Sequence, residues 1–144
     1  MENSANKVKK GNNRIWLFAI SMICLLAAVL LAQAKTEYNY KATAAEHLTL
    51  VVDSIDFRSD LTRIYGRFLG RPHTSQRVDA LALDVNGKKL QASDIDGVDF
   101  KRWFQWEDDG EIPVEIDFPS MSQFESGTLH ITTPRGIDHC TVSR

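Results

Sequence analysis

The apolar and polar positions divide the chain into two parts with different patterns. Residues 15–32, from Ile15 to Ala32, form one run of eighteen residues without a charged side chain. As an α-helix this run would be about 27 Å long at ~1.5 Å per residue, close to the thickness of the hydrocarbon core of a bilayer. From Leu48 onward, apolar positions come in short groups separated by turn residues. The pattern therefore predicts one membrane-spanning helix followed by a domain of short strands.

The charges that flank the apolar run predict its orientation. Four basic residues lie before it: Lys7, Lys9, Lys10 and Arg14. Directly behind it, Lys35 is balanced by Glu37. Because positive charge collects on the cytoplasmic side of membrane helices, we expect residues 1–14 in the cytoplasm and the chain after the helix outside it.

A cleaved signal peptide is the second interpretation of the same segment. Ala32-Gln33-Ala34 has the small-x-small pattern of a cleavage site, which would cut the chain after Ala34. The apolar run is longer than the roughly 7–15 residues of a usual signal core, which favours an uncleaved anchor. Both interpretations place the remaining chain outside the cytoplasm. It is anchored in the first case, and secreted or periplasmic in the second.

The segment behind the apolar run predicts a linker and then two strands. Residues 33–47 show no sustained period, and we interpret them as a tether with Tyr38 and Tyr40 as aromatic anchors at the lipid headgroups. Residues 48–57 are rich in β-branched side chains, which favours a strand. Residues 61–70 fit either a strand or a short helix. Gly66 would cost about 1 kcal/mol in a helix, and the neighbouring segments are strands, so we favour a strand.

A hairpin is the clearest local signal. Residues 78–85 alternate, with Leu81, Leu83 and Val85 on one side, and lead into Asn86-Gly87. This dipeptide favours a type I′ turn, so a return strand should follow it. Three further segments predict strands: residues 100–107, 112–118 and 128–133. Pro113 lacks an N–H donor and indicates an edge position or a strand start. Residues 134–144 predict a frayed tail.

These segments together predict an all-β antiparallel sandwich over residues 48–133. The alternating strand that ends in D-x-N-G-K (84–88), the V-E-I-D-F-P segment (114–119) and the G-T-L-x-I strand (127–131) carry a resemblance. In this rhythm of strands, from about Leu48 to Thr133, the chain resembles immunoglobulin-like extracytoplasmic domains of bacterial envelope proteins. The resemblance implies an immunoglobulin-like β-sandwich. It lacks the paired cysteines of antibody-type domains, and it transfers no functional residue.

Charge and cysteine content exclude two classes of protein. Of the 17 basic and 19 acidic residues, four and one lie in positions 1–34, so the following 110 residues carry 13 and 18, a net charge near −5. Nucleic acid is not the expected partner, because phosphate binding relies on clustered Lys and Arg. Cys24 would lie in the bilayer and Cys140 near the C-terminus, so the domain is not held together by disulfides.

Three carboxylates lie at a spacing that partly matches a calcium-binding loop. Asp94, Asp96 and Asp99 have a spacing that can wrap Ca²⁺, but an EF-hand loop needs Gly at position six and Glu at position twelve. Here Gly97 is at position four and Gln105 at position twelve. We therefore expect no metal and no cofactor, and interpret the segment as an Asp-rich turn, with calcium binding as the weaker alternative.

Enzyme chemistry has little support in the sequence. Among the histidines, only His130 with His139-Cys140 can converge as zinc ligands, and this is a poor site by its spacing. The chain has no G-x-S-x-G, P-loop, dinucleotide fingerprint or H-E-x-x-H motif. Catalytic triads assemble from distant residues, so an enzyme stays open as an alternative. The sequence favours a protein without catalytic activity.

The aromatic segment 100–107 is the best candidate for a partner-binding surface. In a strand, alternation places two sets on opposite faces: Phe100, Phe104 and Trp106 on one, and Lys101, Trp103 and Gln105 on the other. We expect the first set in the core. Trp103 is then exposed beside polar residues, as suits protein or carbohydrate binding, unless a loop or the tether covers it.

The sequence thus predicts a membrane-anchored extracytoplasmic interaction or assembly module. The expected partners are the membrane, through Ile15 to Ala32, and a protein of the envelope. A small exported enzyme and a metal- or glycan-binding module are the alternatives.

Overall fold

The computed structural model describes residues 35–144, and its regular elements are all β-strands. The predicted cytoplasmic segment 1–14, the membrane segment 15–32 and the cleavage site at Ala34 lie outside the described residues. Within residues 35–144, no helix is long and apolar enough to cross a bilayer.

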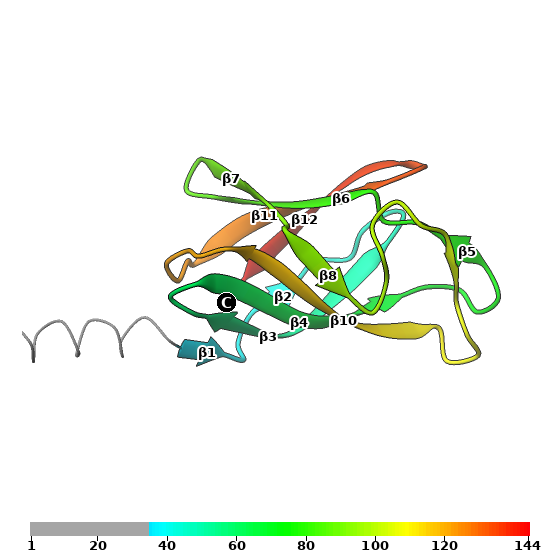
Figure 1. Ribbon diagram of the computed structural model, residues 1–144, viewed down its shortest axis with the longest axis horizontal. Helices are drawn as coiled ribbons and strands as arrows, with labels where there is room; N and C mark the ends of the chain where they lie inside the picture. Colours follow the sequence, from blue (N-terminus) through cyan, green and yellow to red (C-terminus); the bar gives the residue numbers. More distant parts are fainter. Residues whose placement is uncertain (1–34) are drawn as a thin grey trace, which may run out of the picture. The chain divides into compact units, whose positions relative to one another are not determined.

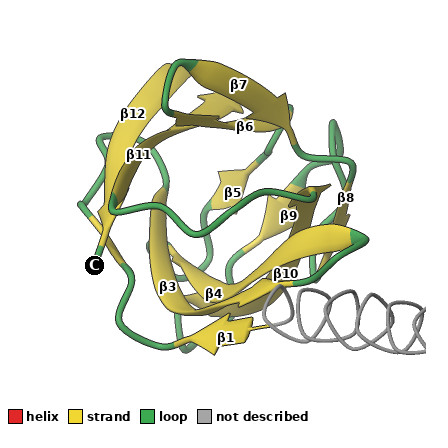
Figure 2. Ribbon diagram, turned by 90° about the vertical axis from the view of Figure 1, so that its left-hand side faces the viewer, coloured by secondary structure: helices red, strands yellow, loops and turns green. Residues whose placement is uncertain are grey.

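Two five-stranded antiparallel sheets face each other and enclose the core (Figures 1 and 2). The first sheet has the order β1 (Lys35–Glu37), β3 (Thr49–Phe57), β4 (Leu61–Leu69), β10 (Glu111–Pro119) and β8 (Asp94–Asp96). The second has the order β2 (Lys41–Ala42), β12 (Gly136–Ser143), β11 (Ser126–Thr133), β6 (Ala80–Val85) and β7 (Lys88–Gln91). A third, small sheet pairs β5 (Ser75–Gln76) with β9 (Phe104–Gln105). The predicted all-β sandwich is confirmed at this level.

Alternation of inward and outward side chains builds the core between the sheets. On β6 the inward residues Leu81, Leu83 and Val85 are all buried, as predicted. On β11, Leu129 and Ile131 are fully buried. The sandwich therefore buries one face of each sheet and leaves the other to solvent.

Segment 61–70 forms the strand β4 rather than a helix. It pairs with β3 on one side and with β10 on the other. The strand also requires a glycine at position 66, because a side chain there would collide with the backbone carbonyl oxygen of Val51 on β3. A glycine that is costly in a helix thus allows two strands to approach closely.

The predicted hairpin is also confirmed. Asn86 and Gly87 have φ values of 52° and 77°, the positive range that a type I′ turn requires at both positions. β7 then returns along β6, with Val85 opposite Lys88. Pro113 lies outside the part of β10 that pairs with β8, which begins at Glu115, so it occupies an edge position.

The predicted tether is part of the domain. β1 pairs with β3, and β2 pairs with β12. Tyr40, expected at the lipid headgroups, is instead 1% exposed, and its hydroxyl hydrogen-bonds the backbone oxygen of Phe124. Its ring packs 4.9 Å from that of Phe124 and 5.9 Å from that of Phe57, measured between centroids. Tyr38 is exposed. Burial of one aromatic ring therefore fixes a polar segment that shows no periodicity.

The predicted tail at 134–144 is also a strand. β12 lies between β2 and β11, and its inward residues Asp138, Cys140 and Val142 are buried. Two of these three are not the aliphatic residues that usually mark an inward face, whereas Ile137 points outward and is 56% exposed. The expectation of a frayed tail was wrong because the inward positions of this strand do not form a pattern of alternating apolar residues.

Candidate functional site

The three acidic metal candidates do not converge. Asp94 and Asp96 are exposed on β8, on either side of the buried Ile95. Asp99 lies in the loop behind β8, where its carboxylate pairs with Arg102 at 3.2 Å. Among residues 35–144, the one group of three or more such side chains close enough to share a metal ion lies elsewhere and contains none of these three.

Trp103 is exposed, as its position in the sequence predicts. Its exposed fraction is 57%, in the part of the chain where β5 and β9 pair. The guanidinium of Arg77 lies over the ring, 5.2 Å from its centroid, a cation–π arrangement. Arg77 is itself held by Asp79 through two hydrogen bonds of 2.6 and 3.1 Å. The indole of Trp103 therefore packs against a guanidinium whose position is fixed by Asp79.

The backbone on either side of Trp103 is tied down. The N–H of Lys101 donates to the carbonyl oxygen of Val78 at 2.8 Å. Behind Trp103, β9 pairs with β5, and the exposed Gln105 donates its side-chain amide to the carbonyl oxygen of His73. Lys101 and Gln105 thus flank the indole on a loop held at both ends.

The predicted strand 100–107 is regular only at Phe104 and Gln105, where it forms β9. Lys101 has a φ of 61°, which breaks the alternation before it reaches Trp103. Trp106 is 3% exposed, whereas Phe100 and Phe104 are only partly buried. The period of two therefore assigned Trp106 and Trp103 to the right environments and overestimated the burial of the two phenylalanines.

Gln76 joins this surface to a second polar cluster. Its side chain is 6% exposed, and its amide nitrogen donates to the carbonyl oxygen of His47 at 3.0 Å. Its amide oxygen accepts the backbone N–H of Arg77 at 2.9 Å. A single buried side chain thus fixes the residue that supports Trp103 and the segment that enters β3.

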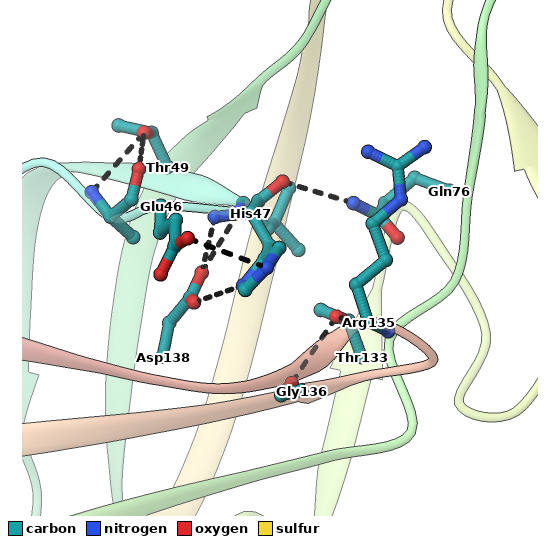
Figure 3. Close-up of polar contacts among 10 residues, drawn as sticks. Glu46, His47, Thr49, Gln76, Thr133, Arg135, Gly136 and Asp138 are labelled. Atoms are coloured by element: carbon teal, nitrogen blue, oxygen red, sulfur yellow. Dashed lines mark hydrogen bonds and ion pairs between the residues drawn. The ribbon is translucent and has the colours of Figure 1, made fainter.

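The second cluster is built around the buried carboxylate of Asp138 (Figure 3). One oxygen lies 2.7 Å from Nδ1 of His47, and the other accepts the backbone N–H groups of His47 and Leu48 at 2.9 Å each. Burial alone would raise the pKa of Asp138. The hydrogen bonds from the His47 ring and the two N–H groups outweigh it and hold this pKa below its usual range.

Glu46, His47 and Asp138 are the group of three side chains that lie close enough to hold a metal ion. Both oxygens of Asp138 already accept hydrogen bonds, and Glu46 approaches the far nitrogen of His47 only at 4.0 Å, with 85% of its side chain exposed. These contacts hold the residues at the start of β3 against β12. Sequence reasoning missed it because its partners are 91 residues apart and Asp138 lay in the predicted tail. The signal available in the sequence was Asp138 itself, a polar residue two positions before Cys140 and four before Val142, on the same face of a strand.

Comparison of the chain with models of protein families, with curated proteins and with solved structures finds no match. The fold and the site therefore define its class. Residues 35–144 form an antiparallel β-sandwich that presents an exposed tryptophan on a rigid support.

Proposed function

We propose that the chain is a single-pass membrane protein whose β-sandwich lies outside the cytoplasm and acts as an interaction or assembly module without catalytic activity. The apolar run from Ile15 to Ala32 and the four basic residues before it support the anchor and its orientation. The partner in this proposal is a protein of the same compartment, and the surface that binds it is centred on Trp103.

The finer class in this proposal is an immunoglobulin-like domain, and the strand order supports it. In such domains one sheet has the order A-B-E-D, and the other joins C with F and G and can add C′. Taking β3, β4, β6, β7, β8, β10, β11 and β12 as strands A, B, C, C′, D, E, F and G turns β3-β4-β10-β8 into A-B-E-D. The same lettering turns β12-β11-β6-β7 into G-F-C-C′. Domains of this kind serve very different functions, so the function is argued from the site.

The observation that carries the proposal is the exposed Trp103 on its fixed support. Tryptophan and arginine are the residues most enriched at the energetic centres of protein interfaces. Arg77 is already held by Asp79, and the loop is tied at Lys101 and Gln105, so little side-chain freedom remains to be lost on binding. A rigid aromatic surface of this kind favours recognition of a partner.

Crosslinking and recovery of partners from the native membrane test the proposal. Trp103→Ala in the full-length chain should weaken the captured complex by about 2 kcal/mol or more, roughly a thirtyfold loss of affinity. The matched control is Tyr38→Ala, which removes the most exposed aromatic side chain of the domain and should leave recovery unchanged. Unchanged recovery with Trp103→Ala would remove this surface from the proposal. Capture of glycans in place of protein would support the glycan-binding alternative.

Sequencing the N-terminus of the mature protein tests the anchor. An uncleaved chain in the membrane fraction is the expected result. A mature chain that begins at Lys35 and is found in the soluble fraction would contradict the anchor and leave export intact.

A further inference from the structure

Two histidines face each other on the outer surface of the second sheet. His130 on β11 and His139 on β12 are directly opposite in the register. Their chain neighbours Leu129 and Cys140 are fully buried in the core, so alternation directs both imidazoles away from it. The Nδ1 atoms of the two rings lie 2.8 Å apart.

The geometry of this pair fits two adjacent ligands of one metal ion. With metal–nitrogen distances near 2.0 Å, two nitrogens at a right angle lie about 2.8 Å apart, and two at the tetrahedral angle about 3.3 Å. The observed 2.8 Å matches the right angle. The rings are nearly perpendicular, at 89°, with centroids 4.7 Å apart, so they meet at their nitrogen edges rather than stacking.

The surroundings expose one ring of the pair and partly bury the other. His139 is exposed, and Ala82 on β6, opposite His130, carries only a methyl group. His130 Nε2 is buried and has no hydrogen-bond partner among the described residues, so no protein contact fixes which nitrogen of that ring carries the proton.

We propose that His130 and His139 form a binding site for a divalent metal ion with tetragonal coordination, Cu²⁺ or Ni²⁺, through their two Nδ1 atoms. Water completes the coordination. Two neutral rings carry the same number of protons before and after binding. The ring that donates from Nδ1 in the metal-free pair changes tautomer by exchange with water, so that each ring then carries its proton on Nε2. The two ligands stand opposite each other on adjacent, paired strands of the second sheet, and β11 is also paired with β6 at His130, so the site is preorganised. The inference is independent of the proposed function, because it uses neither Trp103 nor its support.

Titration of the full-length protein with Cu²⁺ tests the site. The protein is purified in detergent without a polyhistidine tag, and binding is followed by calorimetry and electron paramagnetic resonance. We expect one Cu²⁺ per chain, with hyperfine coupling to two imidazole nitrogens. Ni²⁺ should bind at least as tightly as Zn²⁺, whereas a tetrahedral site would favour Zn²⁺. Preference for Zn²⁺ would overturn the tetragonal assignment.

His139→Asn is the decisive variant, because His139 is exposed and its loss should leave the melting temperature unchanged. It should weaken Cu²⁺ binding ~10-fold or more and reduce the coupling to one nitrogen. The matched control is His73→Asn. It removes another exposed histidine, at a position with a φ of 64° that Asn tolerates, and should leave Cu²⁺ binding unchanged. Equal binding by the His139→Asn protein, or a two-nitrogen spectrum that persists in it, would overturn the proposal.

Discussion

Two tryptophans three positions apart take opposite roles because of what each ring meets. Trp106 is 3% exposed and packs directly against Gly70, where a Cβ atom would occupy the space of the indole. Trp103 is 57% exposed and lies against the guanidinium of Arg77. The first ring is held by exclusion of water and close packing, the second by a charged side chain at the surface.

Truncation of the two rings should therefore have unequal effects on stability. Trp106→Ala should lower the free energy of unfolding by ~3–5 kcal/mol, because it leaves a large cavity against Gly70. Trp103→Ala should change it by only about 0.5 kcal/mol, as is usual at the surface. Urea denaturation of both variants measures the difference. A loss of several kcal/mol from Trp103→Ala would show that this ring belongs to the core.

The carboxylate of Asp138 should give the domain a component of stability that depends on pH. Its pKa is lower in the folded state than the ordinary value of 3.8. The contribution is therefore fully present above that ordinary value and is lost as the pH falls through the folded-state pKa. Asp138→Asn should destabilise the protein by ~1–3 kcal/mol at pH 7, and the gap to the wild type should close below about pH 4.

Denaturation at several pH values checks the Asp138 prediction. Glu46→Gln is the matched control, since its side chain is 85% exposed and should contribute little. A gap between Asp138→Asn and the wild type that stays constant down to pH 2 would show that folding does not shift the pKa of this carboxyl.

At the scale of elements, the two short N-terminal strands matter more than their length indicates. β1 and β2 hold only three and two residues, yet the chain between them inserts Tyr40 beside Phe57 and Phe124. A fragment that begins at Leu48 should therefore be less stable than one that begins at Lys35, by ~3–5 kcal/mol for the lost ring alone. Equal denaturation midpoints would contradict this and return the segment to the role of a tether.

Alternation and turn chemistry were sufficient to predict the elements in which both act locally. Leu81, Leu83 and Val85 with Asn86-Gly87 specify the hairpin without help from the rest of the chain. β12 escaped prediction because its inward positions include Asp138 and Cys140, whose burial depends on partners far along the chain. Periodicity measures hydrophobicity and does not register a carboxylate that is buried because its hydrogen bonds are satisfied.

In the candidate site, too, one feature could be predicted from the local sequence and the others could not. The exposure of Trp103 follows from local alternation, and the structure confirms it. Its support by Arg77 and Asp79, and the link through Gln76 to His47, join segments that only the tertiary fold brings together. Sequence reasoning can thus nominate a single exposed side chain, whereas the contacts that make it rigid depend on the folded sandwich.

At the scale of the whole domain, contacts between the two ends of the described chain close the sandwich. β2 pairs with β12, His47 and Leu48 bind Asp138, and Tyr40 binds the backbone of Phe124. The N-terminal segment thus contacts both the strand β12 and the approach to β11. Because these contacts span most of the sequence, we expect residues 35–144 to unfold as one cooperative unit and to refold in milliseconds to seconds, as β-sandwiches do.

Because Cys140 is buried, the rate at which its thiol is alkylated measures how often the domain unfolds. Its thiol is fully buried, and burial together with the nearby charge of Asp138 raises its pKa, so the native protein offers no thiolate to an alkylating reagent. In a fragment that begins at Lys35, Cys140 is the only cysteine. Under native conditions its labelling rate should equal the rate set by global unfolding of the domain, and it should rise steeply near the denaturation midpoint. Fast labelling in the absence of denaturant would instead show that β12 opens locally. In an oxidising compartment the same thiol distinguishes folded from unfolded copies, because only the unfolded ones can be trapped as disulfide-linked dimers.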